Sequence, residues 1–333
     1  KQDTRIRTVG SMDISKDVDG MGTSEVIYAV ANGLQRVVAI DAEGNCVEII
    51  DHVQLGRSDM GQFGYIHPLS LDIRTILDED HLIVTGTDEI CTREGRWRRR
   101  TFCISRNYEP FWFSRNLTTG VEKKCTISSN DDNLLFRLIK DSPSIALDNG
   151  SNLYFSYNSR IYKYPITKDA DGVYCPADSQ NISTFTDRTG SNEFNPPSQI
   201  DIDPQDATKM YATSANDHTI QLLDINENFI KEIATAGTRS TEATTSNDEI
   251  NMTSPSALFV SNDRAWIGGN KVSIQEFNIT TGNSFTWVDE MGTSRVSRAI
   301  GARNAITAVV SDSSLTSGAY FGYGFWNGGV RSR

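Results

Sequence analysis

Histidine and cysteine are scarce in this chain, and their scarcity excludes several kinds of site. Among 333 residues there are only 4 His and 5 Cys. The cysteines lack the Cys-x-x-Cys spacing of structural zinc sites, and no histidine lies in a hydrolase motif. The histidines are His52, His67, His81 and His218. We expect structural polar roles for His81 and His218, and we expect that the protein is not an enzyme.

Long apolar runs and an excess of positive charge are also missing. The longest apolar runs fall short of the roughly 18 residues that a membrane-spanning helix needs, so no transmembrane segment is predicted. The first residues lack a signal-peptide pattern, and we expect that any such peptide has been removed. Lys+Arg 32 against Asp+Glu 43 gives a net charge of −11. This acidic balance argues against nucleic acid as a partner, because a polyanion would be repelled.

Short strand-like segments recur along the chain, with turn residues between them. One unit has four such segments, at 197–203, 209–213, 218–224 and 229–233. Four antiparallel strands in about 40–50 residues is the composition of a β-propeller blade. Corresponding second strands are marked by Tyr28, Val84, Tyr154, Tyr211, Trp266 and Val309. The sequence therefore predicts one all-β domain over 1–333, a six-bladed β-propeller of four-stranded antiparallel blades, with five or seven blades as the alternatives.

The spacing of these units and the chain ends add two expectations. Tyr154 follows Val84 by 70 residues, the largest of the intervals, so we expect an insertion or extended hairpin at about 88–135. A closed ring removes exposed sheet edges. We expect a strand over Arg5–Val9 to complete the last blade beside residues 319–326, so that N- and C-terminal strands share it. A frayed N-terminal tail is the alternative.

Three segments in the middle of the chain carry a family resemblance. Residues 236–260 (Ala-Gly-Thr…Pro-Ser-Ala-Leu-Phe-Val), 192–203 and 214–224 resemble the linkers and turns of NHL-type propellers. The resemblance covers about 140–290. It implies a propeller fold and reports no activity.

Some six-bladed propellers similar to this one are lactonases or phosphotriesterases that hold a divalent ion in the central channel. By that resemblance, Asp72, Asp148 and Asp201 are candidate oxygen ligands for Ca²⁺. A Ca²⁺-dependent hydrolase of the lactonase or esterase type is thus an alternative function. The same acids are also the ordinary turn residues after an inner strand, and the main expectation is that there is no cofactor.

A hairpin is predicted within the insertion, between Cys91 and Cys103. Strand-like ends flank Glu94 and Gly95, which we expect at the turn. Pairing about Arg96 and Trp97 would bring Cys91 and Cys103 face to face, and we predict a disulfide between them. A second pairing, Cys125 with Cys175, is a guess, and Cys46 is expected to be a buried strand residue. The alternative is that all cysteines are reduced.

The hairpin also contains the densest positive cluster of this acidic chain. Guanidinium groups suit phosphate or carboxylate, and arginine with aromatic residues is typical of interfaces. The candidate ligand-binding residues are Arg93, Arg96, Trp97, Arg98, Arg100 and Trp112. The alternative is an internal salt-bridged hairpin packed on a neighbouring blade, with Phe111 and Phe113 in the core.

These observations predict a non-enzymatic recognition or adhesion module of an extracellular, periplasmic or cell-surface protein. It would bind a protein or an anionic glycan through loops on one propeller face. If it belongs to a fibre, we expect an oligomer. A plain assembly scaffold is the further alternative.

Overall fold

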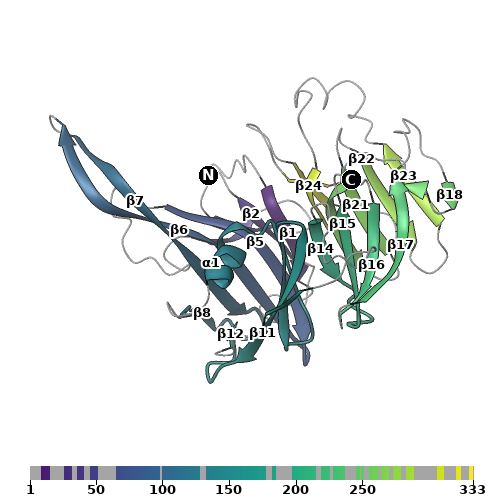
Figure 1. The fold of residues 1–333 in the computed structure, drawn as a ribbon, viewed down its shortest axis with the longest axis horizontal. Helices are drawn as coiled ribbons and strands as arrows, with labels where there is room; N and C mark the ends of the chain where they lie inside the picture. The colour runs from purple at the N-terminus through teal and green to yellow at the C-terminus, as the bar shows by residue number, and fades with distance from the viewer. Residues whose placement is uncertain are drawn as a thin grey trace.

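The structure is a computed structural model. The residues that it describes are 9–15, 26–31, 36–40, 46–51, 65–97, 100–127, 133–177, 182–184, 197–214, 219–225, 228–236, 245–247, 249–250, 255–261, 264–269, 273–278, 283–288, 306–310, 320–323 and 330–332. Within these ranges the chain forms successive, largely antiparallel sheets (Figure 1).

The first three sheets take up the chain as far as residue 184, and each begins with its inner strand. The first has β1 (Val9–Ser15), β2 (Val26–Ala31), β3 (Arg36–Ile40) and β4 (Cys46–Ile50). The second has β5 (Tyr65–Ile76), β6 (Glu79–Trp97), β7 (Arg100–Asn116) and β8 (Glu122–Lys124). The third has β9 (Ser144–Leu147), β10 (Asn152–Tyr157), β11 (Arg160–Lys168) and β12 (Tyr174–Pro176), with β13 (Ser183–Thr184) also paired to β11.

The remaining sheets follow the same order, with additions at their outer edges. The fourth has β14 (Pro197–Ile202), β15 (Lys209–Ser214), β16 (Thr219–Asp224) and β17 (Asn228–Ala236), and β19 (Glu249–Ile250) pairs parallel to β17. The fifth has β20 (Pro255–Ser261), β21 (Arg264–Gly269), β22 (Ser273–Asn278) and β23 (Asn283–Val288), edged by β18 (Thr245–Asn247). The sixth has β24 (Ile306–Val310), β25 (Tyr320–Tyr323) and β26 (Val330–Ser332).

The prediction of an all-β, propeller-like arrangement of four-stranded antiparallel blades is confirmed. The four segments predicted for residues 197–233 are β14 to β17, with ends shifted by at most one residue except at the end of β17, which is three residues longer. One helix, α1 (Asn133–Asp141), was not predicted. Its apolar residues fit a single buried stripe, but nine residues are too few for periodicity alone to stand out.

The core lies between neighbouring sheets, which pack face to face. The aligned residues Tyr28, Val84, Tyr154, Tyr211 and Trp266 are all buried. The strand β2 is buried at all six positions, because a sheet between two others needs apolar side chains on both faces. The side chain of the sixth aligned residue, Val309, lies outside the described set.

The inner strands lie side by side around the centre of the molecule. Strand β1 contacts β5, and in the other direction it contacts β24 of the last sheet. The predicted strand over Arg5–Val9 lies outside the described residues except for Val9, which begins β1 and pairs with Ala31 of the first sheet.

Candidate functional site

The strands β6 and β7 continue far beyond the sheet to which they belong. The pairing of β5 with β6 ends at Glu89, opposite Tyr65, whereas β6 and β7 stay paired as far as Trp97 and Arg100. At about 3.3 Å per residue, the extra eight residues make a two-stranded ribbon of about 26 Å. Figure 1 shows this hairpin projecting from the body of the molecule.

The predicted turn of the hairpin is wrong by several residues. Glu94 and Gly95 lie within β6, opposite Cys103 and Phe102. Trp97 pairs with Arg100, so β6 and β7 are still paired beyond the predicted turn. Residues 98–99 lie outside the described ranges. The Glu-Gly pair suggested a turn from local composition, but the register of a long ribbon is set by its pairing along the whole length.

The Cys91–Cys103 disulfide is present, although the two cysteines are not opposite each other in the ladder. Cys91 pairs with Arg106, and Cys103 pairs with Glu94. The register shifts between Cys91 and Glu94, and the two Cα atoms are 5.8 Å apart. A two-stranded ribbon is marginally stable in water. The disulfide therefore holds together a segment that no third strand supports among the described residues.

The structure places the candidate ligand-binding residues in four different situations. Arg93 is exposed on the ribbon. Arg96, Trp97 and Arg100 lie in its strands, but their side chains are not among those described, and Arg98 lies outside the described residues.

Trp112 does not belong to a ligand-binding surface. It is fully buried, with its ring edge-on to Phe155 of the third sheet at 6.2 Å between centroids. Its neighbours Phe111 and Phe113 are buried in the core between the first and second sheets, as the alternative interpretation of this segment expected. Trp112 follows the ribbon in sequence, but β7 has by then returned to the blade, where both faces are covered.

The root of the ribbon carries features that the sequence did not reveal. Arg106 Nη1 lies 2.9 Å from Glu89 Oε1. The Lys140 ammonium of α1 lies 5.6 Å from the centre of the Tyr108 ring. Tyr108 and Ile104 are exposed by 46% and 52%, which adds aromatic and apolar surface to the basic ribbon.

The three acids suggested as Ca²⁺ ligands do not form one site. Asp148 Oδ1 accepts hydrogen bonds from the N–H groups of Ser151 and Asn152, both at 2.8 Å, and so stabilises a turn. Asp72 and Asp201 each accept a main-chain N–H from the neighbouring inner strand. Among the described residues, no group of three His, Cys, Asp or Glu could hold a metal ion.

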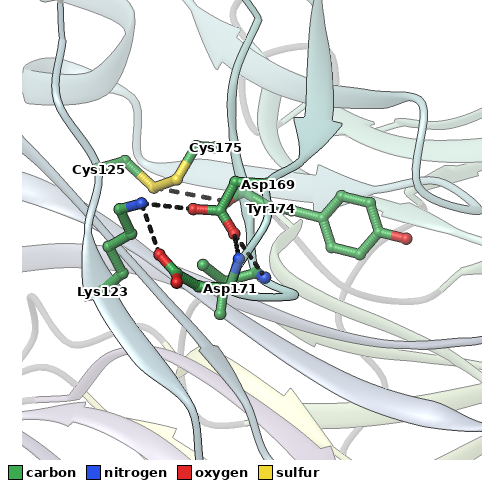
Figure 2. The surroundings of a disulfide bond; sticks show 7 residues. Lys123, Cys125, Asp169, Asp171, Tyr174 and Cys175 are labelled. Carbon is green, nitrogen blue, oxygen red and sulfur yellow. Dashed lines mark hydrogen bonds and ion pairs between the residues drawn. A yellow bond between two sulfur atoms is a disulfide. The ribbon is translucent and has the colours of Figure 1, made fainter.

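A second disulfide, Cys125–Cys175, joins the end of the second sheet to β12 of the third (Figure 2). Beside it, Lys123 Nζ lies 2.6 Å from Asp169 Oδ2 and 2.9 Å from Asp171 Oδ2. The Cys125–Cys175 disulfide is the second pairing, which the sequence offered only as a guess. Cys46 lies in β4 as a free, half-buried cysteine, and burial raises the pKa of its thiol.

No protein-family model matches the chain, and no curated protein matches it in sequence. Among solved structures, it is similar to a structural genomics protein of unknown function from Bacteroides thetaiotaomicron, with a TM-score of 0.56, 13% identity, and coverage of 98% of this chain and 69% of that one. Weaker similarities are to the WD40 repeats of RRP9 (TM-score 0.49, 10% identity, coverage 95% and 73%) and to virginiamycin B lyase from Staphylococcus aureus (TM-score 0.46, 12% identity, coverage 99% and 85%).

The arrangement of the sheets supports a β-propeller fold, and nothing in it singles out the NHL family. Within the described part of the chain, no helix is long and apolar enough to cross a membrane.

Proposed function

We propose that this protein is a non-enzymatic recognition module that binds an anionic partner, a protein or a glycan, through the β6–β7 ribbon. The module is a closed six-bladed propeller of the NHL type, a ring supported by the contacts of β1 with both β5 and β24. It acts outside the cytoplasm, which is supported by the two disulfides, because disulfides persist in oxidising compartments.

The observation that carries this proposal is the separation of charge between ribbon and body. Residues 90–107 contain six arginines and one glutamate, a net charge of +5, which leaves −16 for the rest of the chain. The Debye length in physiological salt is about 8 Å. A ribbon of about 26 Å therefore places its tip several Debye lengths from the acidic body. An anion can then approach the arginines with little repulsion from the remaining −16.

The ribbon also suits recognition by its construction. The blades fix its root, where Phe111 and Phe113 are buried and α1 packs against β6 and β7. The Cys91–Cys103 disulfide limits its freedom before binding. Less conformational entropy is then lost when a partner orders it.

The test is a binding screen on the purified protein with sulfated glycans, sialylated glycans and polyglutamate as probes. We expect binding that weakens steeply with salt, and we expect Arg96→Ser/Arg100→Ser to weaken it at least tenfold. The matched control is Arg137→Ser/Arg160→Ser, which removes two exposed arginines elsewhere and should bind as the wild type does. Equal losses in both variants, or no binding of any anionic probe, would refute the proposal.

A further inference from the structure

Large apolar side chains are exposed at both ends of the paired strands β6 and β7. Four of the five that the described residues expose lie there. Leu77 and Val121 are on the turns at one end, and Ile104 and Tyr108 are on the ribbon at the other. The fifth, Val47, is on β4 of the first sheet. Single exposed apolar residues are ordinary, but their grouping at two places is typical of surfaces that bind a partner.

Leu77 is the most exposed of these side chains, and its backbone conformation is unfavourable for leucine. The side chain is 85% exposed, and Leu77 and Asp78 form the turn between β5 and β6 with φ values of 53° and 64°. Glycine, asparagine and aspartate suit such a two-residue turn, because a bulky side chain at positive φ is strained. A leucine here is favoured neither by the backbone nor by the solvent. The combination points to a contact made outside the chain.

The two turns that expose apolar side chains belong to one acidic surface. The N–H of Leu117 donates to the Asp80 carbonyl at 2.7 Å, which joins the two turns. Lys168 Nζ lies 2.8 Å from Glu79 Oε2, which adds the turn between β11 and β12. The surface contains six acids and two lysines, a net charge of −4. We call it the acidic end and define it as residues 77–80, 117–123 and 168–172.

The lysines of the acidic end leave acids within reach of a partner. Lys123 is shared between Asp169 and Asp171 (Figure 2), and the Asp171 side chain is still 61% exposed. Asp78 is exposed in its turn. A guanidinium group from another molecule could therefore contact carboxylates beside the exposed Leu77 side chain.

The acidic end and the ribbon lie at opposite ends of the same strands. Strand β6 begins at Glu79 in the acidic end and ends at Trp97 in the ribbon, and its 19 residues span about 60 Å at about 3.3 Å per residue. In Figure 1 the ribbon extends to the upper left, whereas β8 and β12 lie near the bottom. Because β6 is extended and paired along this length, the two surfaces cannot meet within one copy.

We propose that the partner of the ribbon is the acidic end of a second copy of this chain, so that copies associate head to tail. The inference rests on the proposed function, since the ribbon is the binding element in both. The charges are complementary, +5 on the ribbon and −4 on the acidic end. Each surface also contributes two exposed apolar side chains, which the contact removes from water.

The charges also decide the geometry of the assembly. Two ribbons repel each other, which disfavours a symmetric dimer that pairs their edges. A contact between two different surfaces leaves one ribbon and one acidic end unused after each addition. Such a head-to-tail contact extends into a longer assembly as the protein concentration rises.

The experiment measures the average mass of the purified full chain by analytical ultracentrifugation, over protein concentrations from about 1 μM to about 1 mM. We expect a mass that rises with protein concentration and falls as salt is added. Leu77→Asn/Val121→Thr removes both apolar side chains of the acidic end and should weaken association at least about tenfold. Asparagine suits the positive φ at position 77, so this variant should fold. The matched control is Val47→Thr, at an exposed valine elsewhere, which should associate as the wild type does.

A mixture of two variants tests the head-to-tail contact directly. The ribbon variant Arg93→Ser/Ile104→Ser and the acidic-end variant Leu77→Asn/Val121→Thr should each stay monomeric. An equimolar mixture should form a dimer and stop there, because one intact ribbon meets one intact acidic end. A mixture that stays monomeric would overturn the proposal.

Binding of polyglutamate separates this proposal from the proposed function. The acidic-end variant keeps its ribbon, so it should bind polyglutamate as the wild type does. A wild type that binds polyglutamate but stays monomeric at every concentration would overturn the head-to-tail contact alone. Association that is equally strong in the acidic-end variant would also overturn it. A wild type that neither associates nor binds any anionic probe would refute both proposals.

Discussion

Removal of the Cys125–Cys175 disulfide should destabilise the whole protein. The bond joins positions 50 residues apart and links the second sheet to the outer strand of the third (Figure 2). In the chain-entropy treatment, a cross-link of that span lowers the entropy of the unfolded chain by an amount equivalent to about 4 kcal/mol at 25 °C. We therefore expect Cys125→Ser/Cys175→Ser to lower the free energy of unfolding by about 4 kcal/mol.

The other disulfide supplies the comparison. Cys91 and Cys103 are 12 residues apart, for which the same relation gives about 3 kcal/mol. The loss in Cys91→Ser/Cys103→Ser should be smaller than that, because the released ribbon also gains freedom in the folded state. The order of the two effects is thus fixed by loop length and by where each bond lies.

Urea unfolding under non-reducing conditions, followed by tryptophan fluorescence, measures both losses. Lys123→Met is the control for the surroundings of the bond, since it removes the ion pairs with Asp169 and Asp171 and leaves the disulfide intact. The Lys123 side chain is 41% exposed, and ion pairs screened by solvent contribute little. The urea midpoint of Lys123→Met should therefore stay close to that of the wild type. A loss below about 1 kcal/mol for Cys125→Ser/Cys175→Ser, or a larger loss for the ribbon pair, would refute the reasoning.

Two further predictions concern the core around the second and third sheets. Trp112→Ala should lower the free energy of unfolding by about 3–5 kcal/mol, as deletion of a buried aromatic ring does. Tyr108→Ala removes an exposed ring and should change the free energy of unfolding little. Similar losses for the two variants in urea unfolding would contradict the burial of Trp112. Burial, with a smaller effect from the positive charge of Lys168, lowers the pKa of His81, so the unfolded chain takes up a proton first and stability is lost as the pH falls below about 6.5. The difference in free energy of unfolding between the wild type and His81→Gln should therefore shrink between pH 8 and pH 5. A difference that does not change with pH would contradict a lowered pKa of His81.

Much of the fold could be predicted from the pattern of residues. Tyr28, Tyr154, Tyr211 and Trp266 recur in β-branched and aromatic segments, and they are buried between sheets as the repeat required. Such local patterns are decided by the period-two alternation of strands and by turn residues. The helix α1 was missed because its burial depends on β6, β7 and β10, not on its own short sequence.

The candidate site was predicted less completely. The existence of a basic hairpin between two cysteines followed from the sequence, but its turn, its length and the burial of Trp112 did not. The register of a ribbon depends on the sum of its cross-strand pairs. Whether Trp112 faces solvent or Phe155 depends on a sheet that begins some thirty residues later.

The sequence by itself determined the class of fold, the unequal distribution of charge and the cysteines available for pairing, because these depend on composition and short-range order. Only the tertiary structure decided the partners of the acids. Asp72 and Asp148 both follow inner-strand patterns, yet Asp148 closes a turn of its own strand, whereas Asp72 accepts the main-chain N–H of Leu147 on the neighbouring sheet. A carboxyl group binds whatever donor lies nearest in space, and residues 60 or 75 positions apart become neighbours only when the sheets assemble around a common centre.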